Sequence, residues 1–120
     1  MRQEQPSGEY FSVEFSEQCE VDLDACYLRL SQVSPELAGR WQGKILEACF
    51  SLSQFPRRCP MAPEAQSYGL EVRLLVYRDR RSLYRILYTI FAPTEEASGV
   101  VRILRVRQGA RQELNSDDKN

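Results

Sequence analysis

The first apolar pattern in the chain is a short alternation. Phe11, Val13 and Phe15 fall on one side of the segment 10–15, with polar residues between them. Such alternation over a few residues is typical of a strand with one buried face. The preceding residues, 1–9, are polar, and we expect them to be disordered.

Two helical patterns follow this strand. Ser16 is a favourable N-cap residue, and the apolar spacing after it predicts a helix that ends near Gln32. Ser34 and Pro35 give a second start signal, a cap followed by proline at the first helical position. The apolar stripe of the second helix consists of Ala38, Trp41, Ile45, Ala48, Cys49 and Leu52. Because Pro56 should end it, we expect an antiparallel hairpin of helices about 16 and about 20 residues long.

The second half of the chain carries three strand patterns. They are predicted over residues 70–77, 82–91 and 100–107, where apolar and polar positions alternate. A charged turn at 78–81 separates the first two strands, and a polar loop at 92–99 separates the last two. Since short links join antiparallel neighbours, these strands should form an antiparallel meander.

Together these elements predict a single α+β domain over residues 10–111. The helix pair should cover one face of the sheet, with Trp41 as an anchor, and leave the other face to solvent or a partner. The connection 56–69 holds three prolines and a glycine, so no regular structure is expected there. Residues 112–120 are too polar to pack and are expected to be a disordered tail.

Charge is distributed unevenly along the chain. Residues 1–56 hold four bases and nine acids, whereas residues 57–111 hold eleven arginines and five acids. Residues 112–120 hold one base and three acids, so the net charge of the whole chain is only −1. Every base of the middle stretch is arginine, the residue suited to bidentate contacts with phosphate or carboxylate. This asymmetry favours a surface for a polyanion or an acidic peptide.

The cysteines give no sign of a metal site. The chain has four cysteines, no C-x-x-C spacing and no histidine, so we expect no zinc site, no other metal and no cofactor. A polar N-terminus and the lack of a long apolar run favour a cytoplasmic protein without a membrane partner. In that compartment Cys19, Cys26, Cys49 and Cys59 are expected to be reduced, packed thiols.

Four short strings follow one another along the chain: LSQFPRRCP at 52–60, EVRL at 71–74, YRILY at 84–88 and VRILRVRQGAR at 101–111. In this order, on these predicted elements, they resemble the RelE/ParE superfamily of bacterial type II toxin–antitoxin and plasmid stabilization systems. The resemblance implies a growth-inhibiting toxin, blocked in a hetero-oligomer by a cognate antitoxin. It also implies one of two targets. ParE-like members inhibit DNA gyrase, whereas RelE-like members enter the ribosome and cut mRNA as endoribonucleases.

The residues needed for RNA cleavage are incomplete. That reaction requires a base, an acid and cations around the phosphate. Arg85 occupies a position where RelE-like nucleases keep an arginine, and Arg111 is a second candidate. However, Gln108 stands where the family string has histidine, and no tyrosine follows Tyr88, although RelE-like enzymes use one near their C-terminus. The missing histidine and tyrosine favour a ParE-like toxin, and so does the long helical hairpin, which resembles that of gyrase-directed members.

Three residues remain candidates for proton transfer, each with a structural alternative. Tyr77 and Tyr84 alternate with or adjoin core positions, so packing explains them equally. Glu71 is expected to form an ion pair with Arg73 or another neighbour across the sheet. No catalytic residue is therefore assigned.

Arginines of the predicted sheet form the candidate binding site. Alternation directs Arg105 and Arg107 to one face, and Arg85 lies on the neighbouring strand. We predict a patch for the target or the antitoxin, made of Arg73, Arg85, Arg105, Arg107 and Arg111. The arginines at 57–58 and in the turn 78–81 are expected to be merely solvated. A function of another class, a non-toxic nucleic-acid-binding module or a degenerate toxin, stays open.

Overall fold

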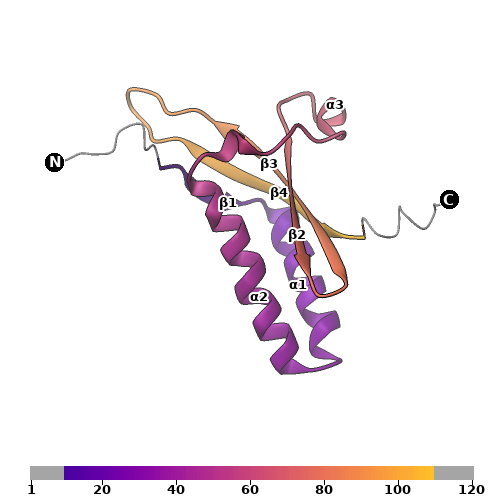
Figure 1. The fold of residues 1–120 in the computed structure, drawn as a ribbon. Helices are drawn as coiled ribbons and strands as arrows, with labels where there is room; N and C mark the ends of the chain where they lie inside the picture. Colours follow the sequence, from indigo (N-terminus) through magenta and orange to yellow (C-terminus); the bar gives the residue numbers. More distant parts are fainter. Residues whose placement is uncertain (1–9, 110–120) are drawn as a thin grey trace.

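The computed structural model describes residues 10–109 as a four-stranded sheet with helices packed on it (Figure 1). Along the chain the elements are β1 (Ser12–Phe15), α1 (Glu17–Ser31), α2 (Pro35–Phe50), the 3-10 turns η1 (Ser51–Ser53) and η2 (Pro56–Arg58), α3 (Ala65–Tyr68), β2 (Arg73–Asp79), β3 (Ser82–Phe91) and β4 (Val100–Gln108). The predicted α+β class is confirmed. The predicted disordered ends, 1–9 and 112–120, lie outside the described residues, as does Arg111.

Both long helices begin at the predicted caps. The Ser16 hydroxyl accepts a hydrogen bond from the Cys19 amide at 3.0 Å. The Ser34 hydroxyl accepts one from the Leu37 amide at 3.2 Å, and Pro35 occupies the first helical position. Each cap satisfies one of the amides that a helix start leaves without an intrahelical partner.

The second helix is shorter than predicted. α2 has 16 residues and ends at Phe50, so the predicted end at Pro56 is wrong, while α1 has 15 residues. The Arg58 guanidinium donates to the carbonyl oxygens of Ser51, at 3.3 Å, and Gln54, at 2.8 Å. Arg58 is therefore not merely solvated, because it satisfies carbonyl groups left open where the helix stops. The helical hairpin is therefore shorter than the one that favoured a gyrase-directed toxin.

The sheet has the strand order β1-β4-β3-β2. The meander β2-β3-β4 is antiparallel, as predicted, and β1 pairs in parallel with β4. A register shift opposite Leu87 and Tyr88 makes Leu104 an extra residue in β4, a β-bulge. Because of this bulge Ile103 and Val106, three positions apart, both pack in the core on the helix side.

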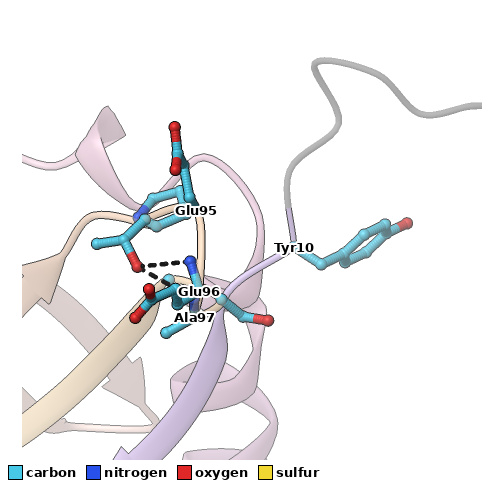
Figure 2. A pocket seen from close by; sticks show the side chains of 8 residues that line it. Tyr10, Glu95, Glu96 and Ala97 are labelled. Atoms are coloured by element: carbon cyan, nitrogen blue, oxygen red, sulfur yellow. Dashed lines mark hydrogen bonds between the residues drawn. The ribbon is translucent and has the colours of Figure 1, made fainter.

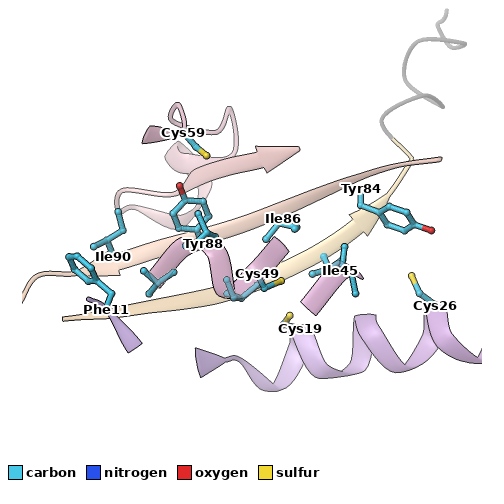
Figure 3. Packing of buried hydrophobic residues seen from close by; sticks show 14 of the residues in the cluster. Phe11, Cys19, Cys26, Ile45, Cys49, Cys59, Tyr84, Ile86, Tyr88 and Ile90 are labelled. Atoms are coloured by element: carbon cyan, nitrogen blue, oxygen red, sulfur yellow. The ribbon is translucent and has the colours of Figure 1, made fainter. Parts of the chain in front are cut away.

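That core lies between the sheet and the pair α1–α2. Figure 3 shows Ile45 and Cys49 of α2 facing Ile86 and Tyr88 of β3. Trp41 has an exposed fraction of only 1%, and its ring centroid lies 5.7 Å from that of Tyr84. The predicted role of Trp41 as an anchor between helices and sheet is confirmed.

The opposite face of the sheet, which we call the outer face, is partly covered. Ala62 packs there on Val72 and Leu87 in a second, smaller cluster. The Ala62 amide donates to the Val72 carbonyl at 2.7 Å, and the short helix α3 follows. The expectation that 56–69 has no regular structure is thus wrong, and the outer face is only partly open. β2 begins at Arg73 rather than at residue 70, where this connection still runs.

All four cysteines are free and buried, as the sequence predicted. Burial raises the pKa of Cys19 and of Cys49 to about 12. None of the helices between residues 10 and 109 has the length and apolar character needed to span a bilayer.

Candidate functional site

A row of three side chains crosses the uncovered part of the outer face. Val76 of β2, Arg85 of β3 and Arg107 of β4 are cross-strand partners. Partners directly opposite one another project from the same face of a sheet. Val76 and Arg107 are exposed, whereas Arg85 is mostly covered. The structure therefore brings together two of the predicted patch residues, and we call these three residues the arginine row.

Glu64 holds Arg85 in place. This residue precedes α3, and its carboxylate accepts two hydrogen bonds from the guanidinium, one from Nη1 and one from Nη2 at 3.1 Å. The Arg85 side chain is 15% exposed and the Glu64 side chain is 34% exposed. The Arg85 hydrogen bonds lower the pKa of Glu64, and the charge of Arg107 acts in the same direction. Among residues 10–109, Glu64 is the carboxylate that binds Arg85, and the Arg107 guanidinium lies next to this pair.

Arg105 is held by a different partner. Its Nε and Nη2 atoms donate to the two Asp22 carboxylate oxygens of α1 at 2.8 and 3.0 Å. The same carboxylate accepts the backbone amide of Val106 at 3.0 Å. The hydrogen bond to Asp22 raises the pKa of Arg105. This guanidinium therefore links α1 to β4. The backbone pairing of Arg105 with Leu87 places the residue on the outer face, next to the arginine row.

Arg73 is separated from the other patch residues. Its cross-strand partner is Tyr88, whose side chain lies in the helix-side core, so Arg73 projects away from the outer face. Its Nε atom donates to Glu71 at 2.6 Å and its Nη1 atom to the Cys59 carbonyl at 2.6 Å. Arg73 therefore fastens the 59–61 segment to the start of β2.

Gln108 acts as a connector between elements. Its amide nitrogen donates to the Ser82 hydroxyl at 3.0 Å, and its amide oxygen accepts a hydrogen bond from Arg29 of α1. At the position where the family string has histidine, this chain thus has a glutamine that joins the end of β4 to α1 and to the start of β3. A side-chain amide neither gains nor loses a proton near neutral pH, so Gln108 cannot act as an acid or a base.

The candidates for proton transfer do not lie beside the arginine row. The two tyrosine candidates, Tyr77 and Tyr84, belong to the helix-side core, as does Tyr88, which was not a candidate. Burial raises the pKa of each of these phenols. Glu71 is paired with Arg73, the structural alternative that the sequence offered. Each of these candidates therefore has a packing or pairing role, and the sheet separates the three tyrosines from Arg85 and Arg107.

Sequence reasoning missed Glu64. It lies in the proline-rich connection, where no periodicity indicates which way a side chain points. The only available signal was the Ala-Pro-Glu string at 62–64. Glu64 and Arg85 are 21 residues apart, so their contact depends on the fold of the connection over the sheet.

A separate hollow lies at the other end of the sheet. It has a volume of about 430 Å³ and is formed by Tyr10 and the loop 93–99 (Figure 2). The Thr94 hydroxyl accepts the amides of Glu96 and Ala97, which fixes this loop. Glu95 and Glu96 give the hollow a negative charge, opposite to that of the arginine row. It is thus not suited to an anionic partner.

Comparison with known proteins places the chain in a family. No curated protein sequence matches it. Residues 13–113 match the family model of the ParE toxin of type II toxin–antitoxin systems, parDE. This match extends from β1 past the end of β4, and it confirms the resemblance of the sequence strings to RelE/ParE toxins. Because the family model matches most of the chain and the fold agrees with it, the chain belongs to the ParE toxin family of type II toxin–antitoxin systems.

Proposed function

We propose that this toxin acts by binding DNA gyrase through the outer face, and that it does not cut RNA. One observation carries the proposal. The phenols of Tyr77, Tyr84 and Tyr88 pack on the helix side of the sheet, whereas Arg85 and Arg107 lie on the other side. A phosphate held by the arginines would therefore have none of these phenols within reach.

The remaining acid beside the arginines is poorly suited to catalysis. Attack of a ribose hydroxyl on the adjacent phosphate needs a proton acceptor and a proton donor. The lowered pKa of Glu64 keeps this group ionised near neutral pH, so it has no proton to give. Its lone pairs already accept two hydrogen bonds from Arg85, which makes it a weak base. The cluster favours recognition of an anionic or acidic surface over proton transfer.

The partner implied by the family is a cognate antitoxin. We propose that the antitoxin covers the arginine row and so competes with the target. An apolar Val76 and an exposed Arg107, one on each side of Arg85, suit an acidic segment that also carries apolar side chains. Neutralisation then follows from occupation of one shared surface.

Pulse labelling after tightly controlled expression in a bacterial host tests the target. Thymidine and methionine incorporation are followed separately from the moment of induction. We expect DNA synthesis to stop first, because gyrase inhibition blocks replication before translation. If methionine incorporation stops first, the toxin acts on translation and the gyrase proposal is wrong. If neither stops, the chain is a degenerate toxin or a binding module.

Arg107→Glu tests the surface itself. Arg107 is exposed and has no ion-pair partner among residues 10–109, so its reversal should leave the fold intact. We expect toxicity or antitoxin affinity to fall by about tenfold or more, as reversal of an interfacial charge commonly does. Arg40→Glu on α2 makes the same charge change at an exposed position away from the outer face and should leave both unchanged. A folded Arg107→Glu protein with unchanged toxicity and affinity would contradict the proposal.

A further inference from the structure

Exposed arginines gather around the β2–β3 turn, at one end of the sheet. Arg80 and Arg81 connect the two strands, and both are exposed. Arg78 lies two residues beyond Val76 in β2, so alternation directs it to the outer face, beside the arginine row. Arg107 is the exposed arginine of that row. Guanidinium groups from two strands and the turn between β2 and β3 thus lie close together.

A fifth arginine belongs to the same end of the molecule. Arg29 lies in the last turn of α1, is exposed, and donates a hydrogen bond to the Gln108 amide oxygen. The Gln108 amide nitrogen donates to Ser82, the residue that follows the turn, at 3.0 Å. Arg29 and Arg107 both line a hollow of about 430 Å³ between α1 and the end of β4. We call the five residues the basic end: Arg29, Arg78, Arg80, Arg81 and Arg107.

Two carboxylates lie near the basic end, and neither forms an ion pair with it. Asp22 lines the hollow, but both of its oxygens accept hydrogen bonds from the Arg105 guanidinium. Asp79 lies two residues beyond Tyr77, so it is directed to the helix side of the sheet. None of the five arginines is ion-paired within residues 10–109. Their guanidinium groups can therefore form charge-assisted hydrogen bonds with an anion from outside the chain.

The backbone of the turn supports a binding role for one of these arginines. Arg80 has a φ of 60°, where a hairpin turn of two residues usually has glycine or asparagine. Strained backbone of this kind is kept mostly at functional positions. An exposed arginine held there at a cost in stability indicates that its guanidinium group is used.

We propose that the basic end binds the phosphate backbone of duplex DNA, and that the DNA contacted in the cell is the segment on which gyrase acts. The cellular role rests on the proposed function, whereas the binding of DNA does not. Arg78 and Arg107 lie on β2 and β4, two inter-strand spacings or about 10 Å apart. Over this length one DNA strand carries about three phosphates. Because contacts to phosphate carry no sequence information, binding is independent of sequence.

The composition of the basic end favours duplex DNA over a protein or a single strand. Interfaces with DNA are much more positively charged than interfaces between proteins. Single strands stack their bases on exposed aromatic rings, whereas Tyr77 and Tyr84, which flank the turn in the strands, pack in the helix-side core. The acidic loop 93–99 lies at the other end of the sheet, so the charge distribution directs the basic end towards a polyanion.

Fluorescence anisotropy of a labelled duplex of 20 base pairs, titrated with the full-length protein, tests this proposal. We expect saturable binding with a Kd below about 100 μM at 50 mM salt. Contact with about three phosphates predicts a slope of about −3 for log K against log salt concentration. The Kd should therefore rise by about 40-fold between 50 and 200 mM salt. A duplex of unrelated sequence should bind within about twofold.

Variants then locate the binding. The double change Arg78→Gln with Arg81→Gln should reduce the steepness of the salt dependence by between about one and two. Arg80→Gly removes a guanidinium group and also the strained φ, so it should bind DNA more weakly without loss of stability. Arg57→Gln is the matched control. This half-exposed arginine lies beside Glu71, before the start of β2 and about 20 Å from the turn, and its change should leave the Kd within about twofold.

Three results would overturn the proposal. The first is the absence of saturable binding to the duplex at 50 mM salt. The second is a salt dependence that the double variant leaves unchanged, since another surface would then bind the DNA. The third is a glutamate-rich peptide that binds the basic end more tightly than the duplex does, which would mark it as a surface for a protein. None of these results decides the pulse-labelling test, which measures the cellular target without reference to DNA binding by the toxin itself.

Discussion

One glutamate determines the electrostatic state of the arginine row. Glu64 binds Arg85 through both carboxylate oxygens, and its pKa is lowered by those bonds. A carboxyl group with a lowered pKa in the folded state stabilises the fold above its unfolded pKa of about 4.5. That stabilisation is lost as the pH falls through the lower, folded value. The stability of the protein in mild acid therefore depends on this pair.

Glu64→Gln should remove this pH dependence. Near neutral pH the variant should unfold more easily than the wild type by at most about 1 kcal/mol, since the pair is partly exposed. The difference should shrink as the pH is lowered further below the unfolded pKa and the wild-type carboxyl takes up a proton. Urea unfolding at several pH values gives the measurement, with Glu95→Gln in the exposed 92–99 loop as the control. A difference that stays constant with pH would show that charge is not the cause.

At the scale of elements, the β2–β3 turn contains a conformational conflict. Asp79 pairs with Ser82, so Arg80 and Arg81 alone connect the strands. Arg80 has a φ of 60°, in the left-handed region. A two-residue hairpin needs such a backbone and is usually built with glycine or asparagine there, because a side chain disfavours it. The turn therefore keeps arginine at some cost in stability.

Arg80→Gly should stabilise the fold by about 1 kcal/mol, since it removes the left-handed strain. The neighbouring change Arg81→Gly gives a matched control. Arg81 has no positive φ, so glycine there only adds freedom to the unfolded chain and should destabilise by roughly 0.5–1 kcal/mol. Thermal unfolding of both variants measures the two effects. If both changes shift the Tm in the same direction, the turn is not strained at Arg80.

The elements also show which parts of the fold could be predicted from sequence. The helix starts at Ser16 and Ser34 were predictable because a cap depends on residues within one turn. The end of α2 was not, because Arg58, from a connection without periodicity, binds the carbonyl and hydroxyl of Ser51 where the helix ends. The bulge at Leu104 was missed for a similar reason, since pairing with β3 creates it.

For the candidate site, alternation along β4 predicted that Arg105 and Arg107 project from one face. The cross-strand pairing places both on the outer face, with Arg107 directly opposite Arg85. The partners of Arg85 and Arg105 could not be predicted from the sequence pattern. Asp22 lies 83 residues before Arg105 and Glu64 lies 21 residues before Arg85, so only the complete fold brings them into contact. Strand faces could thus be predicted from alternation, whereas contacts between distant elements could not.

At the scale of the whole molecule, one core joins both helices to the sheet. The reactivity of two cysteines in this core measures whether it opens. Cys19 of α1 and Cys49 of α2 are both fully buried. Burial raises the pKa of each to about 12, so both remain protonated thiols near neutral pH. Their reaction with alkylating reagents requires the core to open.

Iodoacetamide labelling at about pH 8 should therefore leave Cys19 and Cys49 unmodified in the native protein and modify both in denaturant. Mass spectrometry of peptides after a short exposure distinguishes the four thiols. The rate at these two positions should follow the global unfolding equilibrium as denaturant is added. Modification of either residue in the native protein at the rate of an unfolded control would show that the helix pair separates from the sheet on its own.

The contact of Asp22 with Val106 has a consequence for the behaviour of the protein at high concentration. Where β1 stops, the Ser16 amide and hydroxyl donate to the Ile103 and Leu104 carbonyls, and Asp22 accepts the Val106 amide. An uncovered strand edge is a template for pairing between molecules and hence for aggregation. Here another strand would first have to displace a carboxylate that is also bound to Arg105. The start of α1 thus helps to prevent pairing of this edge between two molecules, and so opposes aggregation of the toxin.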